Sequence, residues 1–395
     1  MLCGKASCPV ILRYYQSMKV APLIDTLELD GSSPPSVFVG RIGYPKVSVG
    51  PLIPPVHGDT SILDTPEKWV GKSMDEIVAM RSQLVRGKYS VKVDQVEGGG
   101  RLVDMVRDLA MARGPAHVEA SFLKKPRGGL VLSDEVQPHG PSAPLRSLDI
   151  GSLKIDRRIE RAYSDTDLPA REAVLTLYKD DVSVTQIQRS FSVGAFGEES
   201  RRRFVPTRWS ITAVDDTISK HLVQQVKDFP WINEYRVYES WSLDNRFIVL
   251  QMPGSWSYEL VEAWYPRTTW NPHGREIAIY SSAEGYRGRS KYAEIGGCYY
   301  AARLATSEHL AGERRQATTV ILREAHPGYI MPVGVWNVRE NVRAAFRERP
   351  RTFESLKTAL EYVQTRLDIP LSTWIRNSRV LRDRLHQRRI EEFTG

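Results

Sequence analysis

The hydrophobic positions in the middle of the chain alternate with polar ones at a period of two, which is typical of β-strands. Four segments show this alternation, at 182–187, 235–241, 247–251 and 258–264. Short breaks such as 242–245 and 253–254 separate the last three segments, and short connections favour antiparallel pairing. Apolar runs at 36–49, interrupted by a turn, and at 318–324 predict further strands.

Helical spacing dominates the region after residue 288. Phe353, Leu356, Leu360, Val363 and Leu367 recur at intervals of three and four, which predicts a helix with one buried stripe. Ile369–Pro370 ends that helix, and a last helix follows it into the basic C-terminal segment.

Three helix starts are visible nearer the N-terminus. Ser73 and Glu76 match a capping box ahead of an apolar helix face. Thr65 followed by proline predicts a short helix. A helix is also expected over 216–227, with Asp215 or Asp216 as its cap.

These elements predict an α+β protein with a central, mostly antiparallel sheet, flanking helices, a helical C-terminal unit and a short flexible C-terminal tail. A chain of 395 residues exceeds the size at which one hydrophobic core stops growing, so two or more packed units are expected. No repeat of fixed period occurs, which argues against solenoids and propellers.

The composition places the chain among ordinary globular proteins, with 41% hydrophobic and 26% charged residues. No tract is long and apolar enough for a membrane span, and the first residues lack the order of a secretory signal. The three cysteines, an odd number, indicate a reducing compartment. We therefore expect a cytoplasmic, nucleoid-associated protein without a membrane partner.

Positive charge is in excess, with 55 Lys and Arg against 47 Asp and Glu, and the arginines are clustered. Such clusters suit contact with phosphate, although a solvated helix face gives the same pattern. Aromatic and basic residues also alternate between 264 and 289. Nucleic-acid bases could stack on the aromatic rings while the arginines contact the phosphate backbone. The candidate nucleic-acid-binding residues are Arg41, Arg201, Arg202, Arg203, Arg208, Trp209, Trp270, Arg275, Tyr286 and Arg287.

The sequence does not decide whether the protein is an enzyme. Asp215 and Asp216 lie near arginines, as a metal-dependent nuclease requires, but a helix cap explains Asp216 better. Glu284 and Glu324 are further candidate carboxylates. There is no phosphate-binding Gly-x-x-x-x-Gly-Lys loop, which argues against ATP-driven unwinding.

The last nine residues contain Gln387, Ile390 and Phe393 at a spacing of three. This pattern resembles the PIP box, a peptide that docks on the DNA sliding clamp PCNA. A spacing of three places Ile390 and Phe393 on the same side of one helical turn, so both can enter one apolar pocket. Thr394 stands where the motif usually has a second aromatic residue, which should weaken the grip. The alternative is a chance pattern at a frayed helix end.

Cys3 and Cys8 are spaced like half of a structural zinc site, so zinc is a candidate cofactor. Zinc needs four ligands, and no second pair is evident. An idle thiol pair is an equally good interpretation.

Five segments together resemble the archaeal Nre DNA-repair proteins: Cys3 to Pro9, Ser33 to Pro51, Pro206 to Asp216, Pro327 to Trp336, and the terminal tail. The resemblance covers nearly the whole chain. It implies a zinc-knuckle-like N-terminal segment at 1–20, left incomplete by the single cysteine pair or by a shortened start. It further implies an N-terminal Nre domain at 33–288, a C-terminal Nre domain at 289–386 and a clamp-binding tail at 387–395.

The resemblance also implies a function. We expect a DNA-repair factor that binds DNA and is recruited to PCNA, with other excision-repair proteins as further partners. A nucleic-acid-processing enzyme, such as a metal-dependent nuclease, is the alternative.

Overall fold

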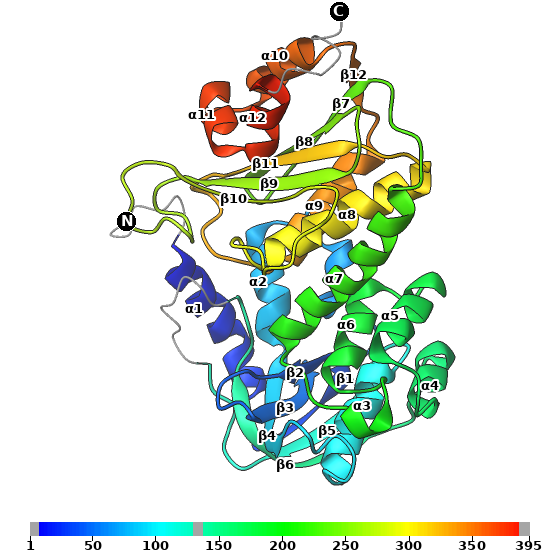
Figure 1. Ribbon diagram of the computed structural model, residues 1–395. Coiled ribbons are helices and arrows are strands. Elements are labelled where there is room, and N and C mark those ends of the chain that lie inside the picture. The colour runs from blue at the N-terminus through cyan, green and yellow to red at the C-terminus, as the bar shows by residue number, and fades with distance from the viewer. Residues whose placement is uncertain (1–7, 129–136, 387–395) are drawn as a thin grey trace, which may run out of the picture. The chain divides into compact units, whose positions relative to one another are not determined.

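The computed structural model describes residues 8–128 and 137–386, and they divide into two compact units, Cys8–Ile218 and the part of Ser219–Gly395 up to residue 386. We call these the N-terminal and C-terminal units (Figure 1). Each unit is built on its own six-stranded sheet, so the predicted α+β class is confirmed, with two sheets where the sequence pattern indicated a central one. The long helix α7 (Thr207–Val226) runs through the boundary between the two units.

The sheet of the N-terminal unit has the strand order β1-β5-β6-β4-β3-β2, and β4–β6 is its parallel pair. Its strands are β1 (Glu28–Ser33), β2 (Val37–Val39), β3 (Lys46–Ile53), β4 (Val85–Lys92), β5 (Ala116–Phe122) and β6 (Ser142–Ile150). The helices of this unit are α1 (Pro9–Val20), α2 (Met74–Gln83), α3 (Arg101–Met111), α4 (Arg157–Ser164), α5 (Ala170–Lys179), α6 (Val184–Ser192) and the start of α7. Four short 3₁₀ turns complete it: η1 (Ala21–Leu23), η2 (Ser61–Asp64), η3 (Pro66–Lys68) and η4 (Glu199–Arg201). Helix α3 packs on the sheet, with Val103 and Val106 fully buried.

The sheet of the C-terminal unit has the order β10-β9-β11-β8-β7-β12, and only the β9–β11 pair is parallel among these strands. The strands are β7 (Tyr235–Ser242), β8 (Asn245–Met252), β9 (Ser257–Trp264), β10 (Ala278–Glu284), β11 (Thr318–Ala325) and β12 (Arg351–Phe353). Helices α8 (Gly297–Glu313) and α9 (Trp336–Arg347) cover one face, and α10 (Leu356–Arg366), α11 (Leu371–Asn377) and α12 (Arg379–His386) cover the other (Figure 1).

Both faces of this second sheet are buried, and β8 shows it directly. Phe247 and Val249 enter the core under α8 and α9, while Ile248 and Leu250 enter the core under α10–α12. A strand that is covered on both sides reads as a continuous apolar run, which explains the run at 247–250.

Most local predictions are confirmed. The capping box of Ser73 and Glu76 starts α2, the segment 36–49 forms β2 and β3, and the predicted strands at 235–241, 247–251, 258–264 and 318–324 are present. The helix expected at Thr65 is only the 3₁₀ turn η3, and Thr65 makes no side-chain cap. The predicted last helix is two helices, α11 and α12.

Two predictions near residue 200 were wrong. The segment 182–187 belongs to the start of helix α6, because the Ser183 side chain accepts a hydrogen bond from the Gln186 N–H and caps the helix. Helix α7 starts at Thr207, so Asp215 and Asp216 lie inside the helix and do not cap it. Within the described part of the chain, no helix has the length and hydropathy to cross a membrane.

Candidate nucleic-acid interface

A loop of the N-terminal unit and the first turn of α7 bring two aromatic rings together at the surface. The Tyr44 and Trp209 ring centroids lie 5.3 Å apart with 54° between the ring planes. Each side chain is about half exposed, at 47% and 46%. Arg41, Ile42 and Arg208 are exposed beside them in sequence, and we call these five residues the Trp209 patch.

The Trp209 patch is held by the hairpin between β2 and β3. The Lys46 N–H donates to the Gly43 carbonyl at 2.9 Å, which closes the loop. Gly43 has φ +86°, and a Cβ there would lie 2.8 Å from the Lys46 oxygen, so the turn requires glycine. The Val39 N–H, on the edge strand, donates to the Thr207 hydroxyl at 3.0 Å and fixes the loop to α7.

The closed loop leaves Ile42 90% exposed. A single exposed apolar side chain is common at protein surfaces and gains weight only as part of a larger apolar patch. Ile42 lies two residues from Tyr44 in the same turn, so an exposed apolar side chain stands close in sequence to the Tyr44–Trp209 pair, whose rings can stack on unstacked bases.

Three exposed cations border the same loop. Lys46 lies directly opposite Lys92 in the β3–β4 pair. The Val93 N–H donates to the Pro45 carbonyl at 2.9 Å, and the Phe204 N–H donates to the Val93 carbonyl at 2.8 Å. These backbone contacts bring the segment that carries Arg203 next to the one that carries Lys92, and we call the exposed residues Lys46, Lys92 and Arg203 the basic rim.

The basic rim has fewer negative charges than positive ones. Asp94 is an exposed carboxylate two residues from Lys92. Like charges directly across a strand pair are destabilising, so the lysine pair costs stability. This arrangement suits a phosphate backbone.

Arg202 was predicted at a nucleic-acid surface, but it is buried. Its Nε donates to the Gly197 carbonyl at 2.8 Å, and a terminal nitrogen donates to the Tyr163 carbonyl at 2.7 Å. The guanidinium carbon lies 4.9 Å from the centre of the Tyr163 ring. Arg202 therefore organises the chain around Tyr163, while Arg201 is exposed and forms an ion pair with Glu198 at 3.1 Å.

A second concentration of positive charge, not predicted from the sequence, surrounds Asp64. Arg81 and Arg189 both form ion pairs with its carboxylate, and the Ser36 hydroxyl donates to it. The guanidinium of Arg86 lies 4.4 Å from the centre of the Phe38 ring. These residues come from distant parts of the chain, so no spacing pattern in the sequence predicts the cluster.

The electrostatics of this cluster are unusual. Burial, followed by the charge of Arg81, lowers the pKa of Arg86 to about 9. Burial and then Arg86 lower the pKa of His139 to about 4, so this imidazole is neutral at pH 7. The Asp64 carboxylate raises the pKa of Arg86, but it is outweighed by burial and Arg81.

The aromatic and basic residues predicted in the C-terminal unit fall into two places. Trp270 and Arg275 lie in the loop before β10, and Tyr286 and Arg287 lie just after it. The seven residues of β10 separate them by roughly 20 Å. The sequence segment therefore does not form a single surface.

Each of these two places has its own contacts. Trp270 packs edge-on against Trp264 with centroids 6.3 Å apart. Arg275 lines a cavity of about 400 Å³ together with Arg267. The Lys227 ammonium lies 5.0 Å from the centre of the Tyr286 ring.

The candidate carboxylates of a nuclease are engaged inside the protein. Asp215 is fully buried and accepts a hydrogen bond from the Gln188 amide at 2.8 Å. Asp216, the next residue of the same helix, points about 100° away around its axis. Within the described residues neither aspartate belongs to a group of three side chains that could hold a metal ion.

Glu284 is the centre of a buried network in the C-terminal unit. Its carboxylate accepts hydrogen bonds from Trp256 at 3.0 Å, Tyr299 at 2.8 Å and Arg303 at 2.8 Å. Burial, followed by the Glu284 charge, raises the pKa of the Tyr299 hydroxyl. We call these four residues the Glu284 network, and both oxygens of its carboxylate are occupied.

Glu324 anchors a loop. Its side chain is fully buried and accepts hydrogen bonds from the backbone N–H groups of Asp368 and Ile369 at 3.0 and 2.9 Å. Arg246 and His326 also contact this carboxylate, each at 3.3 Å. These contacts give it a structural role at the start of α11.

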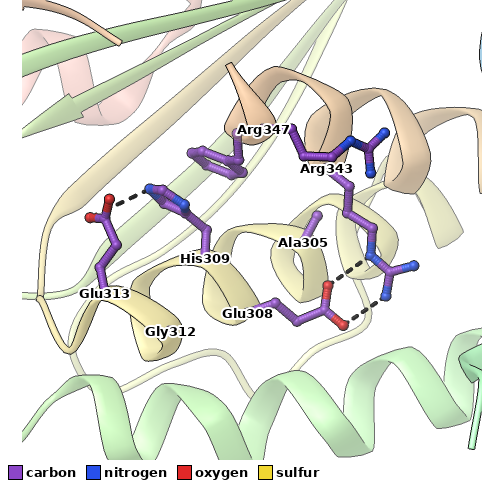
Figure 2. A pocket seen from close by; sticks show the side chains of 8 residues that line it. Ala305, Glu308, His309, Gly312, Glu313, Arg343 and Arg347 are labelled. Atoms are coloured by element: carbon purple, nitrogen blue, oxygen red, sulfur yellow. Dashed lines mark hydrogen bonds and ion pairs between the residues drawn. The ribbon is translucent and has the colours of Figure 1, made fainter. Parts of the chain in front are cut away.

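A cavity of about 410 Å³ lies between α8 and α9, and four of its polar side chains form two pairs, Arg343 with Glu308 and His309 with Glu313 (Figure 2). Arg343 donates to both oxygens of Glu308, at 2.8 and 2.7 Å. His309 stacks on Phe346 with centroids 4.0 Å apart. Burial lowers the pKa of His309 to about 4, although the nearby Glu313 raises it.

The predicted clamp-binding residues Gln387, Ile390, Phe393 and Thr394 lie outside the described residues, as does Cys3. Cys8 precedes α1 as its N-terminal cap residue and forms no disulfide.

Comparison with known proteins identifies the family. Residues 2–271 match the model described as "Archaeal Nre, N-terminal", and residues 284–393 match "Archaeal Nre, C-terminal". The chain belongs to the archaeal Nre family. No solved structure matches it.

Three relatives in this Nre family are similar over most of their length. "DNA repair protein NreB" of Archaeoglobus fulgidus is 40% identical over 394 residues, covering 100% of this chain and 97% of the relative. "DNA repair protein NreA" of the same organism is 35% identical, covering 93% and 92%. "DNA repair protein NreA" of Haloferax volcanii is 36% identical, covering 89% and 86%.

Within this Nre chain, two of the segments that carried the family resemblance meet at one place. The segment from Ser33 to Pro51 supplies Arg41, Ile42 and Tyr44, and the segment from Pro206 to Asp216 supplies Arg208 and Trp209. Sequence reasoning singled out Arg41, Arg208 and Trp209 but omitted Tyr44 and the lysine pair. The exposed Gly-Tyr-Pro turn was the signal for Tyr44; nothing local in the sequence pointed to Lys46 facing Lys92.

Proposed function

We propose that this protein is a DNA-repair factor that binds DNA through the Trp209 patch and the basic rim, and that its C-terminal tail recruits it to PCNA. The observation that carries the DNA-binding part is the exposed Tyr44–Trp209 pair with cations on its borders. The names of its relatives, all DNA repair proteins, support the repair role. The proposed location is the cytoplasm, at the nucleoid.

The chemistry favours DNA with unstacked bases. Aromatic side chains stack on any exposed base, and each such contact contributes about 1–3 kcal/mol. Arginines and lysines around them neutralise phosphates and make binding strongly dependent on salt. Single-stranded, forked or damaged DNA offers such bases, whereas intact duplex DNA does not.

DNA binding is tested with the double variant Arg41→Ala/Arg208→Ala. We expect weaker binding to labelled single-stranded DNA and a salt slope reduced by about one unit for each lost phosphate contact, measured by fluorescence anisotropy at several salt concentrations. The matched control is Arg157→Ala/Arg171→Ala, which removes two exposed arginines from α4 and α5. Equal losses in the two double variants would show that the charge acts without a defined site.

Recruitment to the clamp rests on Gln387, Ile390 and Phe393. Ile390 and Phe393 are expected to fill an apolar pocket of PCNA together, with Gln387 hydrogen-bonded beside them. Because Thr394 provides less apolar contact than an aromatic residue, we expect modest affinity. A clamp with several equivalent pockets adds avidity.

Calorimetry with purified PCNA tests the tail. Phe393→Ala and a deletion of residues 387–395 should both abolish binding and leave the thermal unfolding of the protein unchanged. Glu391→Gln, which keeps Gln387 and both apolar anchors, is the control and should bind like the parent protein. Undiminished affinity of the deletion variant would refute the role of the tail.

Zinc held through Cys3 and Cys8 is a separate proposal. These two thiols supply half of a structural site, and Cys298, the third cysteine of the sequence, lies in α8 and packs against the core of the C-terminal unit. Metal analysis of the Cys3→Ser/Cys8→Ser variant against the parent tests it: equal zinc content would contradict it.

The second candidate function is a metal-dependent nuclease. The internal hydrogen bonds of Asp215 and Glu284 weigh against these carboxylates as its ligands, whereas Glu324 lies with His326 and Asp368 in a group that could hold a metal ion. A screen of single-stranded, forked and damaged DNA with Mg²⁺ or Mn²⁺ tests it. Product formation that is lost in Asp216→Ala, with DNA binding retained, would favour the enzyme.

A further inference from the structure

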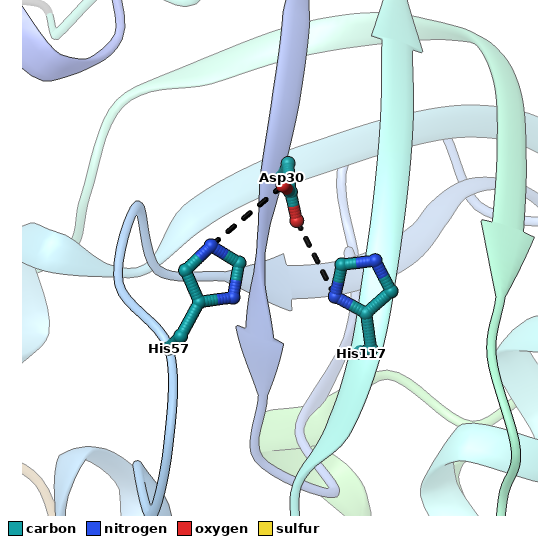
Figure 3. Close-up of side chains that lie close together, drawn as sticks. All are labelled: Asp30, His57 and His117. Carbon is teal, nitrogen blue, oxygen red and sulfur yellow. Dashed lines mark ion pairs between the residues drawn. The ribbon is translucent and has the colours of Figure 1, made fainter.

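Three side chains that can bind metal converge on the surface of the N-terminal unit (Figure 3). Asp30 lies on β1, His117 on β5, and His57 in the segment after β3. His57 Nε2 lies 3.6 Å from one Asp30 oxygen, and His117 Nδ1 lies 3.3 Å from the other. One ligand atom from each residue falls within 4.8 Å of the others.

The sheet places Asp30 and His117 on the same face. In the antiparallel β1–β5 pair, Asp30 is opposite Glu119 and Ser32 is opposite His117. Asp30 and His117 are therefore diagonal neighbours, and in both strands these positions are the exposed ones. Their relative position is fixed by strand register.

His57 is held from both sides by the same strand. The Ser32 N–H donates to the Val56 carbonyl at 2.8 Å, and the Gly58 N–H donates to the Ser32 hydroxyl at 3.0 Å. The segment passes so close to β1 that a Cβ on Gly31 would lie 1.9 Å from the Pro54 oxygen. The backbone on either side of His57 is therefore fixed two residues from Asp30.

Glu119 completes the arrangement from outside. One of its carboxylate oxygens lies 3.1 Å from His117 Nε2, on the opposite side of the ring from Asp30. A carboxylate in this place accepts the Nε2 hydrogen and leaves Nδ1 free to bind a cation. This is the usual support of a metal-binding histidine.

We propose that Asp30, His57 and His117 bind a divalent transition-metal ion of the zinc type. Two imidazoles and one carboxylate are a ligand set that Zn²⁺ accepts, and three protein ligands leave a position for water. Imidazole also favours such ions over Mg²⁺, which prefers a shell of oxygen atoms. The ion would tie the segment 54–60 to the β1–β5 edge of the sheet.

The site is separate from the cysteine pair and from the DNA-binding surface proposed above. Its residues are Asp30, His57, His117 and Glu119, and none of them is in the Trp209 patch or the basic rim. The tests of the three proposals therefore fail independently.

The test uses the full-length chain carrying Cys3→Ser and Cys8→Ser, so that thiols cannot bind the probe. Zn²⁺ is titrated into this protein by calorimetry, after chelator treatment and dialysis. We expect one bound ion per chain, and loss of this binding in Asp30→Asn, in His57→Gln and in His117→Gln. The control is His273→Gln, an exposed loop histidine of the C-terminal unit, which should bind like the parent.

Two further readouts separate a built site from scattered surface histidines. Glu119→Gln should weaken Zn²⁺ affinity by about 10-fold without abolishing binding, because it only supports His117. Zn²⁺ should raise the thermal unfolding midpoint of the parent and leave that of Asp30→Asn unchanged, since only the native state holds the site.

Folding of the variants is checked without metal. Asp30, His57 and His117 are all exposed, so the metal-free variants should unfold at the same temperature as the parent. Binding of Zn²⁺ by the Asp30→Asn/His57→Gln/His117→Gln triple variant with the affinity and stoichiometry of the parent would overturn the proposal. So would equal loss in the His273→Gln control.

Discussion

The Trp209 patch and the Glu284 network contain the same types of residue, arginine with Trp and Tyr, but they differ in exposure and charge balance. In the Glu284 network the carboxylate and Arg303 are both 2% exposed and lie 2.8 Å apart. In the Trp209 patch Arg41 and Arg208 are exposed, and the two rings are half open to solvent. An arginine that is paired with a carboxylate inside the protein stabilises the fold. An exposed arginine without such an ion pair is available to a partner.

The comparison extends to the rest of the C-terminal unit. Its core contains a second buried ion pair, in which Arg323 lies 2.7 Å from Glu262. The guanidinium carbon of Arg323 also lies 4.7 Å from the centre of the Trp264 ring. Both buried pairs join α8 or β11 to neighbouring strands. Residue types that suggest nucleic-acid binding in the sequence therefore also build cores, as the Glu284 network and the Arg202–Tyr163 contact show, and only their exposure distinguishes the two uses.

The largest effect is expected from Glu284→Gln. This change removes the negative charge and leaves Arg303 buried without its counter-ion, and breaking a buried pair in this way costs about 3–5 kcal/mol. Urea unfolding followed by fluorescence should show this loss in the free energy of unfolding. DNA affinity, measured below the unfolding transition, should not change.

Glu276→Gln is the matched control, because Glu276 is exposed and precedes the same strand, β10. It should change stability by less than about 0.5 kcal/mol. If Glu284→Gln were as stable as this control, the Glu284 network would not be structural, and Glu284 would return as a candidate catalytic group.

The fold was predictable where the pattern is local. Strands β7, β8, β9 and β11 follow from alternation or apolar runs, and the α2 start follows from Ser73 and Glu76. What could not be predicted depends on distant contacts. Strand β11 is inserted between β8 and β9, so those two strands are not neighbours as expected. Segment 182–187 alternates like a strand, but the Ser183 cap makes it a helix.

The candidate site divides in the same way. Arg41, Arg208 and Trp209 were identifiable by residue type, but their meeting depends on the bond from Val39 to Thr207 across the fold. Arg202 was misassigned because its neighbours in sequence, Arg201 and Arg203, are exposed while its own side chain turns inward to Tyr163. Burial of a single residue within a charge run is not visible in composition.

The next largest effect concerns the pH dependence of the free energy of unfolding. It involves one buried histidine in each unit. Burial lowers the pKa of His309 in the C-terminal unit and of His139 in the N-terminal unit to about 4, from 6.5. Above pH 6.5 both states are neutral and nothing changes. Below pH 6.5 the histidine is protonated in the unfolded chain but stays neutral in the native state. Each histidine therefore lowers the free energy of unfolding as the pH falls from 6.5 to 4.

At pH 5 this cost is about 2 kcal/mol for each histidine. His309→Gln and His139→Gln should each flatten the decline in unfolding free energy between pH 7 and pH 5, measured by urea unfolding at both values. His221→Gln, which changes a histidine of α7, is the control. A decline as steep in both variants as in the parent would contradict the assignment.

A smaller effect, of about 1–3 kcal/mol in binding, is expected from Trp209→Ala, because one stacking surface for a base is removed. Anisotropy with single-stranded DNA measures it, and stability should change little since the ring is half exposed. Trp231→Ala is the control, a tryptophan 58% exposed in the C-terminal unit. Equal affinity of the two variants would remove Trp209 from the proposed interface.

The smallest effect is expected from Lys92→Gln, and its sign is what matters. Removing one of two lysines that face each other should stabilise the free protein by about 0.2–1 kcal/mol, because their repulsion is relieved. The same change should weaken DNA binding and lower the salt slope by about one unit. Lys72→Gln, at a partly exposed ion pair with Glu76 beside the start of α2, is the control and should do neither. If Lys92→Gln stabilises the protein and weakens DNA binding, the basic rim is a surface whose positive charges are left unpaired for a partner, in contrast to the buried Glu284 network. If both stability and binding fall, Lys92 belongs to the residues that stabilise the fold.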